Sequence, residues 1–516
     1  MRVHSFRLVA VSAALVLAAC GTDSQTSTIV ATNTRGTLVA NPPLRIASLT
    51  SQAFGAELNA SASGQGLLAL AGAPACGVDF HYYSFWTVDP GGTAIMDTAA
   101  LMVPTGSAAP CSGGRPIVLY AHGTDTDKTD NIADVTNPNN GEGVLIAAMF
   151  AAHGYIVVAP NYAGYDASSL DYHPYLNANQ ESKEMIDALT AARQALGHLA
   201  ANAATDGGKL FVTGYSEGGF VAMATQRALQ AMSATAVTAA APLSGPYAME
   251  WLGDAIFLGR VNIGSTVFAP LVTTSYQHAY GNIYSSPGDV YDPLYATGID
   301  TLLPSATPLA TLFGEGKLPQ TTLFNGVPPV PNTGNALLDA QLTAVLAPNP
   351  NLPFSLGFST PPAPGLVNNS YRLGYAIDAL LHPDGAIFGF PGNPLAAAPA
   401  QKLRVALKLN DMRQWVGGPT SPTLMCGGSQ DPTVYFGDTV IMANFWGLPP
   451  PLVNKLDVSQ PAQVTDSPAT VALKGAFAAT EAQIFAAGGL AAVVGSYHAT
   501  VAPFCVAAAR GFFDLF

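Results

Sequence analysis

The feature that most constrains the fold is a repeated alternation between short apolar runs and helix-like segments. Continuous apolar runs are typical of strands buried on both faces. Strands that alternate with helices form parallel sheets through right-handed crossovers. The sequence therefore predicts an α/β protein with a doubly wound, mostly parallel sheet. The predicted strands are 115–121, 155–159, 210–213 and 236–243, with helices at 143–153, 182–198 and 219–232.

The alternation stops after residue 245 and resumes near residue 400. Residues 246–399 are rich in Pro, Gly, Asn and aromatic residues, which predicts an inserted cap or lid region placed over the sheet. The segments 46–245 and 400–516 then form the two parts of the core. The other predicted elements are antiparallel strands within 79–104 around the turn 90–92, helices at 335–346, 371–382 and 401–415, and strands at 423–426 and 491–494.

The first residues have the pattern of an export signal. Arg2 and Arg7 precede an apolar stretch that ends at Cys20, so residues 1–19 are expected to be removed. The stretch resembles a bacterial lipoprotein signal, which implies that Cys20 is lipidated; ordinary cleavage with an incidental Cys20 is the alternative. Residues 20–45 would form a flexible tether. We expect membrane contact only through this anchor and predict no transmembrane helix.

Charge and cysteine content narrow the possible partners. The chain has 20 Lys+Arg against 33 Asp+Glu, a net charge of −13. Because it has no basic cluster, nucleic acid is not an expected partner.

Without Cys20, four cysteines remain, Cys76, Cys111, Cys426 and Cys505, and four allow three pairings. No CxxC or HxxxH spacing suggests a metal site, so we expect neither metal nor cofactor. The oligomeric state stays open.

A chemical motif occurs where one predicted strand meets the next helix. Residues 214–218 read Gly-Tyr-Ser-Glu-Gly, and a turn this sharp needs glycine on both sides of Ser216. The helix N-terminus would favour negative charge beside the serine. In a glycine-rich chain the pattern alone is weak, and a tight turn without chemistry is the alternative. Its position between a buried strand and a helix favours a reactive serine.

Further motifs, taken together with the turn around Ser216, resemble those of a known superfamily. With His122-Gly123-Thr124, the segments 154–160 and 214–219, Asn410-Asp411 and the Gly-Ser-Gln-Asp of 428–431, the chain resembles the α/β-hydrolase superfamily. Within it, the chain resembles the secretory-lipase and bacterial secreted esterase group. The resemblance covers about 111–245 and 401–505. It implies an acyl-enzyme mechanism without cofactor and a lid over the site.

The resemblance implies a nucleophile, an acid and a base in that order along the chain. Ser216 would be the nucleophile and His498, after the predicted strand 491–494, the base; the other two histidines beyond Ser216, His278 and His382, lie in the insertion. Asp431, after the strand 423–426, would be the acid. The competing carboxylates are Asp411, towards the end of a helix, and Asp438, which comes late after the strand.

The same resemblance implies an oxyanion hole formed by the backbone N–H groups of Thr124 and Glu217. His122, His173 and Tyr215 are candidate substrate contacts, although a turn role for His122 and a packing role for the loop 172–175 are the alternatives.

The fold implies that the loops carrying the acid and the base adjoin. We therefore expect disulfides Cys426–Cys505 and Cys76–Cys111.

Aromatic side chains of the insertion would either line an acyl or aromatic pocket or form the cap's own small core. They are Trp251, Phe257, Phe268, Tyr276, Phe313, Phe324, Phe354 and Phe358.

The expected activity is hydrolysis of fairly hydrophobic carboxylic esters by an exported protein, either secreted or held in the cell envelope (the outer membrane) as a lipoprotein. A serine peptidase of the same fold and a catalytically silent surface lipoprotein are the alternatives.

Overall fold

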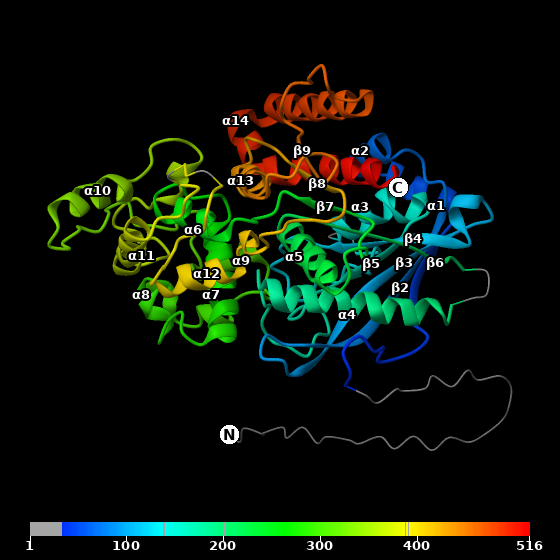
Figure 1. Ribbon diagram of the computed structural model, residues 1–516, viewed down its shortest axis with the longest axis horizontal. Coiled ribbons are helices and arrows are strands. Elements are labelled where there is room, and N and C mark those ends of the chain that lie inside the picture. Colours follow the sequence, from blue (N-terminus) through cyan, green and yellow to red (C-terminus); the bar gives the residue numbers. More distant parts are fainter. Residues whose placement is uncertain (1–32, 138–139, 200–202, 388, 391) are drawn as a thin grey trace, which may run out of the picture.

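The computed structural model describes residues 33–137, 140–199, 203–387, 389–390 and 392–516 (Figure 1). The expected leader 1–19, Cys20 and the tether up to residue 32 lie outside the described residues. One nine-stranded sheet runs through the centre of the molecule in the order β1-β2-β3-β5-β4-β6-β7-β8-β9. Its strands are β1 Leu44–Leu49, β2 Gly77–Val88, β3 Ala94–Thr105, β4 Gly114–Ala121, β5 Ile156–Pro160, β6 Thr205–Tyr215, β7 Ala239–Leu243, β8 Thr423–Gly427 and β9 Val453–Asp457.

The sheet is antiparallel at one edge and parallel through the rest. β1, β2 and β3 pair antiparallel, and β3 pairs antiparallel with β5. From β5 to β9 every pairing is parallel. The predicted doubly wound, mostly parallel sheet and the antiparallel pair around the turn 90–92 are confirmed.

Helices cover both faces of this sheet. In β4, Ile117 and Leu119 pack into a core with α4 and α5, whereas Val118 and Tyr120 pack into a second core with α3 and the end of α14. This alternation follows from the period of two along a strand and explains why β4 is apolar from Ile117 to Ala121. The covering helices are α1 Ser51–Asn59, α2 Ala62–Ala71, α3 Gly141–Met149, α4 Ala178–Leu196, α5 Glu217–Met232, α13 Gly437–Trp446 and α14 Pro468–Phe513.

The chain between β7 and β8 forms a largely helical region beside one end of the sheet (Figure 1). Buried ion pairs connect its helices: Arg404 contacts Asp254 and Asp378 at 2.7 Å each. Its helices are α6 Met249–Phe257, α7 Ser265–Tyr280, α8 Pro293–Ala296, α9 Leu309–Gly314, α10 Ala336–Leu346, α11 Asn369–Leu381 and α12 Lys402–Asn410.

The C-terminal part of the fold differs from the prediction. Residues 491–494 are helical and belong to α14, whereas the last strand is β9. A short apolar run fits a buried strand and a buried helix equally well. Here Val493, Tyr497 and Val501 are buried at four-residue spacing, which is the spacing of a helix face. The helix is interrupted at Gly489, with φ 66° and ψ −162°.

The same helix bears on the prediction that the chain has no transmembrane helix. Of the described helices, only α14 is long and apolar enough to cross a membrane by length and composition. Its second part is a core helix of the protein, since Val501, Cys505 and Ala509 are fully buried.

Both expected disulfides are present. Cys76 pairs with Cys111, which joins the start of β2 to the segment before β4. Cys426 in β8 pairs with Cys505 in α14, so the C-terminal helix is linked covalently to the parallel sheet.

Candidate active site

Ser216 lies at the turn between β6 and α5 in a strained conformation, with φ 62° and ψ −124°. A Cβ atom on Gly214 would lie 2.3 Å from the Gly218 carbonyl oxygen, and one on Gly218 would lie 2.0 Å from the Ala121 carbonyl oxygen. Both glycines are therefore required by close backbone contacts, as the sequence predicted. Left-handed backbone is rare for serine and is typical of functional sites.

The turn after β4 lies beside this serine. A Cβ on Gly123 would lie 3.7 Å from Ser216 Cβ, so Thr124 is close to the turn. Glu217 is the first residue of α5, a position whose N–H has no partner inside the helix. The half-buried Glu142 accepts hydrogen bonds from Gly123 N–H at 3.1 and 3.2 Å. This support was not predicted; Glu142 directly precedes the predicted helix 143–153 and lies in the first turn of the observed α3.

Asp431 and His498 are in direct contact. His498 Nδ1–H donates to Asp431 Oδ2 across 2.6 Å. The Asp431 carboxylate also accepts hydrogen bonds from the Thr433 and Val434 N–H groups and from the Ser244 hydroxyl. Asp431 is 4% exposed, so its carboxylate is held in one orientation. Ser244, directly after β7, is a second contact that sequence analysis missed.

The competing acids have structural partners. Asp411 contacts Arg413 at 2.8 Å and accepts a hydrogen bond from the Glu250 N–H. Asp438 accepts a bond from the Ala248 N–H, and burial raises the pKa of its carboxyl well above the usual value. Neither carboxylate is bonded to a histidine.

Ser216 and His498 line the same wide cleft. His498 Nε2 is buried and has no hydrogen-bond partner among the described residues, so no bond joins it to Ser216 in this structure. A catalytic hydrogen bond is often formed only once substrate is bound.

Two cavities meet at Ser216. The first is an apolar pocket of about 870 Å³ that extends between α6, α7 and α12. Glu217 is the only one of its lining residues with an ionisable acidic or basic side chain. The second is the wide cleft, of about 2190 Å³, whose lining includes Thr124, His498 and residues of α2 and α14. Asp431 lies outside both cavities, behind His498.

The expected substrate contacts are only partly supported. His122 is buried outside both cavities, with Nδ1 2.7 Å from the Gly123 carbonyl oxygen and Nε2 3.1 Å from the Asn161 carbonyl oxygen. Burial lowers its pKa, but nearby carboxylates, Glu142 first, raise it, and the net shift is upward. His122 is thus a turn residue rather than a substrate contact.

Tyr215 lines the wide cleft, and its hydroxyl donates to the His498 carbonyl oxygen at 2.6 Å. His173 lines neither cavity. Its neighbour Tyr175 lines the apolar pocket instead.

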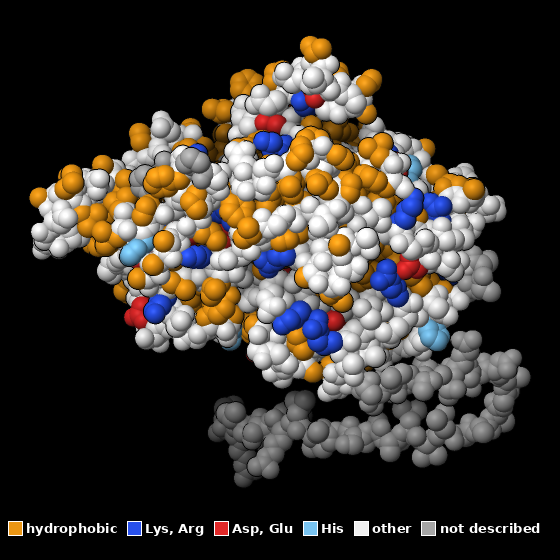
Figure 2. Space-filling view, in the orientation of Figure 1, with side chains coloured by type: hydrophobic (Ala, Val, Ile, Leu, Met, Phe, Trp, Pro, Cys, Tyr) orange, Lys and Arg blue, Asp and Glu red, His pale blue; other side chains and the backbone are white. Residues whose placement is uncertain are grey.

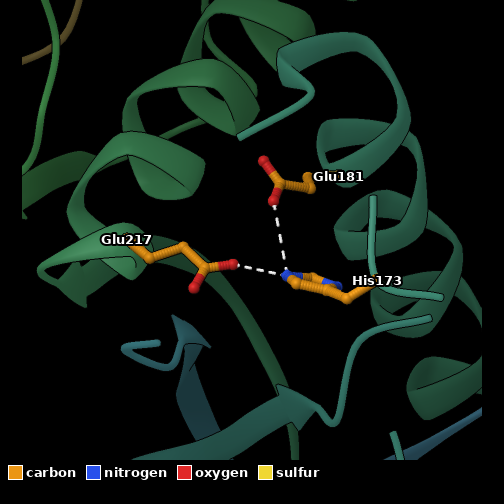
Figure 3. A group of neighbouring side chains, drawn as sticks. All are labelled: His173, Glu181 and Glu217. Carbon is orange, nitrogen blue, oxygen red and sulfur yellow. Dashed lines mark hydrogen bonds and ion pairs between the residues drawn. The ribbon is translucent and has the colours of Figure 1, made fainter. Parts of the chain in front are cut away.

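His173, Glu181 and Glu217 form a buried cluster directly beneath the turn (Figure 3). His173 Nε2 lies 2.7 Å from Glu217 Oε1 and 3.9 Å from Glu181 Oε1, and Nδ1–H donates to the Ala163 carbonyl oxygen. In the described residues this is the one group of His, Cys, Asp and Glu side chains close enough to hold a metal ion, with ligand atoms within 4.8 Å. The 2.7 Å contact between His173 Nε2 and Glu217 Oε1 is a hydrogen-bond distance.

The aromatic residues of the insertion divide into two groups. Phe257 and Phe268 line the apolar pocket. The others line neither cavity and contribute to packing within the inserted region and against its neighbours. They are Trp251, Tyr276, Phe313, Phe324, Phe354 and Phe358.

Comparison with known proteins agrees with this architecture. Residues 144–253 match the sequence model of the prolyl oligopeptidase family. No curated protein sequence matches the chain. A ligand-bound form of the rice cell wall degrading esterase LipA from Xanthomonas oryzae is 24% identical, with a TM-score of 0.64, over 93% of this chain and 98% of that one. A Legionella pneumophila protein with a provisional hydrolase name is 18% identical, with a TM-score of 0.62, over 92% and 96%. At these identities the likeness concerns the fold.

Proposed function

We propose that this protein, which has the α/β-hydrolase fold, is an exported serine hydrolase that cleaves carboxylic esters of fairly hydrophobic acids. One observation carries the proposal: a strained serine faces an apolar pocket on one side and, on the other, a cleft that contains a histidine bonded to a buried carboxylate.

In the proposed reaction His498 Nε2 removes the proton of Ser216, and Oγ attacks the ester carbonyl carbon. The N–H groups of Thr124 and Glu217 stabilise the oxyanion. The tetrahedral intermediate then expels the alcohol, which takes the proton from His498. Water, deprotonated by His498, attacks the carbonyl carbon of the acyl-enzyme. The second tetrahedral intermediate releases the acid, and Ser216 Oγ takes the proton back from His498. Asp431 accepts the Nδ1–H bond throughout, which fixes the ring and stabilises the imidazolium.

The two cavities suggest where the acyl part and the alcohol part of the ester bind. The leaving oxygen must come within reach of the proton donor, and His498 lines only the wide cleft. We therefore assign the alcohol part to the wide cleft and the acyl part to the apolar pocket. Fully burying apolar groups there contributes about 0.8 kcal/mol per CH₂, so the pocket favours longer acyl chains over acetate.

A serine peptidase is the second candidate, because the match at residues 144–253 is to a peptidase family. The lining of the apolar pocket argues against it. An aminopeptidase needs an accessible carboxylate for the substrate's N-terminal amine. The one carboxylate among the residues that line this pocket, Glu217, is 1% exposed and its Oε1 is hydrogen-bonded to His173.

A substrate panel tests the proposal. We expect hydrolysis of p-nitrophenyl esters from acetate to palmitate, little cleavage of aminoacyl anilides, and a loss of about 10⁴-fold or more in kcat for Ser216→Ala. Anilide cleavage without ester cleavage would establish the peptidase. Full activity in Ser216→Ala would refute the role of the serine, and an inert wild type would favour a silent binding protein.

Export is consistent with the two disulfides, since such bonds persist in oxidising compartments. We further propose that Cys20 carries a lipid. Metabolic labelling with a palmitate analogue should be lost in Cys20→Ala; labelling that persists in this variant would refute the anchor.

A further inference from the structure

The first part of α14, residues 468–488, projects from the body of the protein (Figure 1). Gly489 separates it from the second part, which begins with Leu490. Residues 468–488 together with Leu490 are called the outer helix here. Among residues 468–488, only Lys474 and Phe477 are buried. This first part of the helix is therefore largely uncovered.

The inward side of the outer helix holds its anchoring and charged residues. Phe477 is buried, Ile484 is partly buried, and both pack against the core beneath α14. Lys474 is 7% exposed and pairs with Asp466 at 2.8 Å, and Glu481 is half-buried. Lys474 and Glu481, the two charged residues of the outer helix, therefore do not lie on its outward side.

The outward side is apolar. Phe485 and Leu490 are each 58% exposed and Val471 is 42% exposed. Hydrophobic side chains are visible at this end of the molecule, as elsewhere on the same face (Figure 2). Most other exposed positions between them are alanine, and Gln483 is the only exposed polar side chain between 469 and 490. Exposed apolar surface of this kind marks contact with a membrane or a partner.

The outer helix also borders the wide cleft. Ala476 and Thr480 line the cleft together with Ser216 and His498, and Leu67 and Leu70 of α2 line it as well. The outer helix therefore forms part of the rim of the cleft.

We propose that the outer helix docks on an uncharged or zwitterionic lipid surface, with Phe485 and Leu490 entering the lipid, so that the wide cleft opens beside that surface. A protein partner would normally find hydrogen-bonding groups and a polar rim in its interface, and this face offers almost none. The net charge of −13 disfavours anionic membranes. The docking face is independent of the catalytic chemistry; only delivery of substrate from the lipid to the cleft rests on the proposed function.

Vesicle binding tests the docking face without catalysis. Every protein carries Cys20→Ala and Ser216→Ala, so that neither an attached lipid nor hydrolysis affects the result. We expect Phe485→Glu/Leu490→Glu to lower the partition coefficient on phosphatidylcholine vesicles about tenfold or more. A matched control, Val330→Glu/Leu337→Glu, changes two residues that are 85% and 71% exposed in the inserted region and should bind like the parent.

Two further readouts separate lipid from other occupants. Tryptophan at position 485, introduced as Phe485→Trp, should be quenched by brominated phosphatidylcholine, whereas Leu337→Trp should not. Binding should persist in high salt and should not increase with anionic lipid.

Three results would overturn the proposal. They are equal binding by both double variants, absence of vesicle binding by the parent, and a dimer in sedimentation that Phe485→Glu/Leu490→Glu dissociates, which would identify a second copy as the occupant. With Ser216 restored, hydrolysis of a soluble short-chain ester should be unaffected by the outer-helix substitutions. Failure of that hydrolysis in the parent would therefore count against the proposed function alone.

Discussion

The two sides of Ser216 are built in different ways. On the sheet side, the backbones of β4, β6 and α5 approach so closely that a single Cβ on Gly218 would lie 2.0 Å from a carbonyl oxygen. On the inserted side, the apolar pocket is formed by side chains such as Leu403, Leu407 and Ala269, packed between helices. The position of the serine therefore depends on the backbone, whereas the shape of the pocket depends on side chains that can be exchanged.

This difference has a consequence for substitutions. A change on the sheet side should affect every substrate equally, because it moves the reacting groups. A change on the inserted side should affect stability or selectivity and leave the reacting groups in place.

The largest effect is expected for Gly218→Ala. The added methyl group would collide with the Ala121 backbone, which cannot move without shifting β4, so we expect loss of activity towards all esters and reduced yield of folded protein. The control is Gly374→Ala in α11, where a Cβ meets nothing within 4 Å. It should be neutral or raise stability by up to about 1 kcal/mol. Thermal unfolding and the ester panel give both readouts; an active, stable Gly218→Ala would remove the basis of the comparison.

The second-largest effect is expected for Arg404→Met in the inserted region. Removing this buried guanidinium leaves Asp254 and Asp378 without their ion pairs, which should lower the free energy of unfolding by about 3–5 kcal/mol. Arg193→Met is the matched control, because its ion pair with Asp206 is exposed and contributes about 1 kcal/mol or less. Denaturant unfolding compares the two. Equal losses would mean that the inserted region is not held together by its buried ion pairs.

A smaller and more selective effect is expected for Ala269→Phe. The larger side chain would fill part of the apolar pocket, so kcat/KM for palmitate should fall about tenfold or more relative to acetate, about 1.4 kcal/mol or more in transition-state binding. Equal loss for both esters would show that the acyl chain lies elsewhere.

The smallest effect is a pH dependence of stability. Burial raises the pKa of Asp97 well above its usual 3.8, and the charge of Glu184 raises it further. The folded protein then keeps a proton that the unfolded chain releases, so Asp97 makes stability fall as pH rises above about 4 and on through its folded pKa. Asp97→Asn cannot ionise and should show a smaller fall in Tm between about pH 5 and about pH 8. The exposed control Asp171→Asn should follow the wild type; an unchanged slope in Asp97→Asn would assign the pH dependence to other groups.

The same contrast explains how far the sequence could predict the structure. The sheet core was predictable because each strand from 115 to 243 contains a run of buried residues that are mostly apolar, and because close backbone contacts require the glycines around Ser216. The contact between Asp431 and His498 followed from chain order, although His498 lies in a helix where a preceding strand was expected.

Other structural features could not be predicted from a sequence pattern. β9 was missed because Val453–Asp457 contains Asn454 and Lys455, which break its apolar run. The lining of the pocket could not be separated from packing, since Phe257 and Phe324 look alike in sequence and only Phe257 lines the pocket. Glu142 and Ser244 act through contacts between segments distant along the chain, which no local pattern encodes.

The disulfide between Cys426 and Cys505 joins the two elements that carry the proposed acid and base. Asp431 follows one sulfur by a few residues, and His498 precedes the other by about two helical turns. These two side chains thus belong to a covalent ring, and their relative position depends on the oxidation state of the compartment. In a reducing compartment the proposed acid and base would be aligned by packing alone, so we expect the proposed hydrolytic activity to be highest where this disulfide can form.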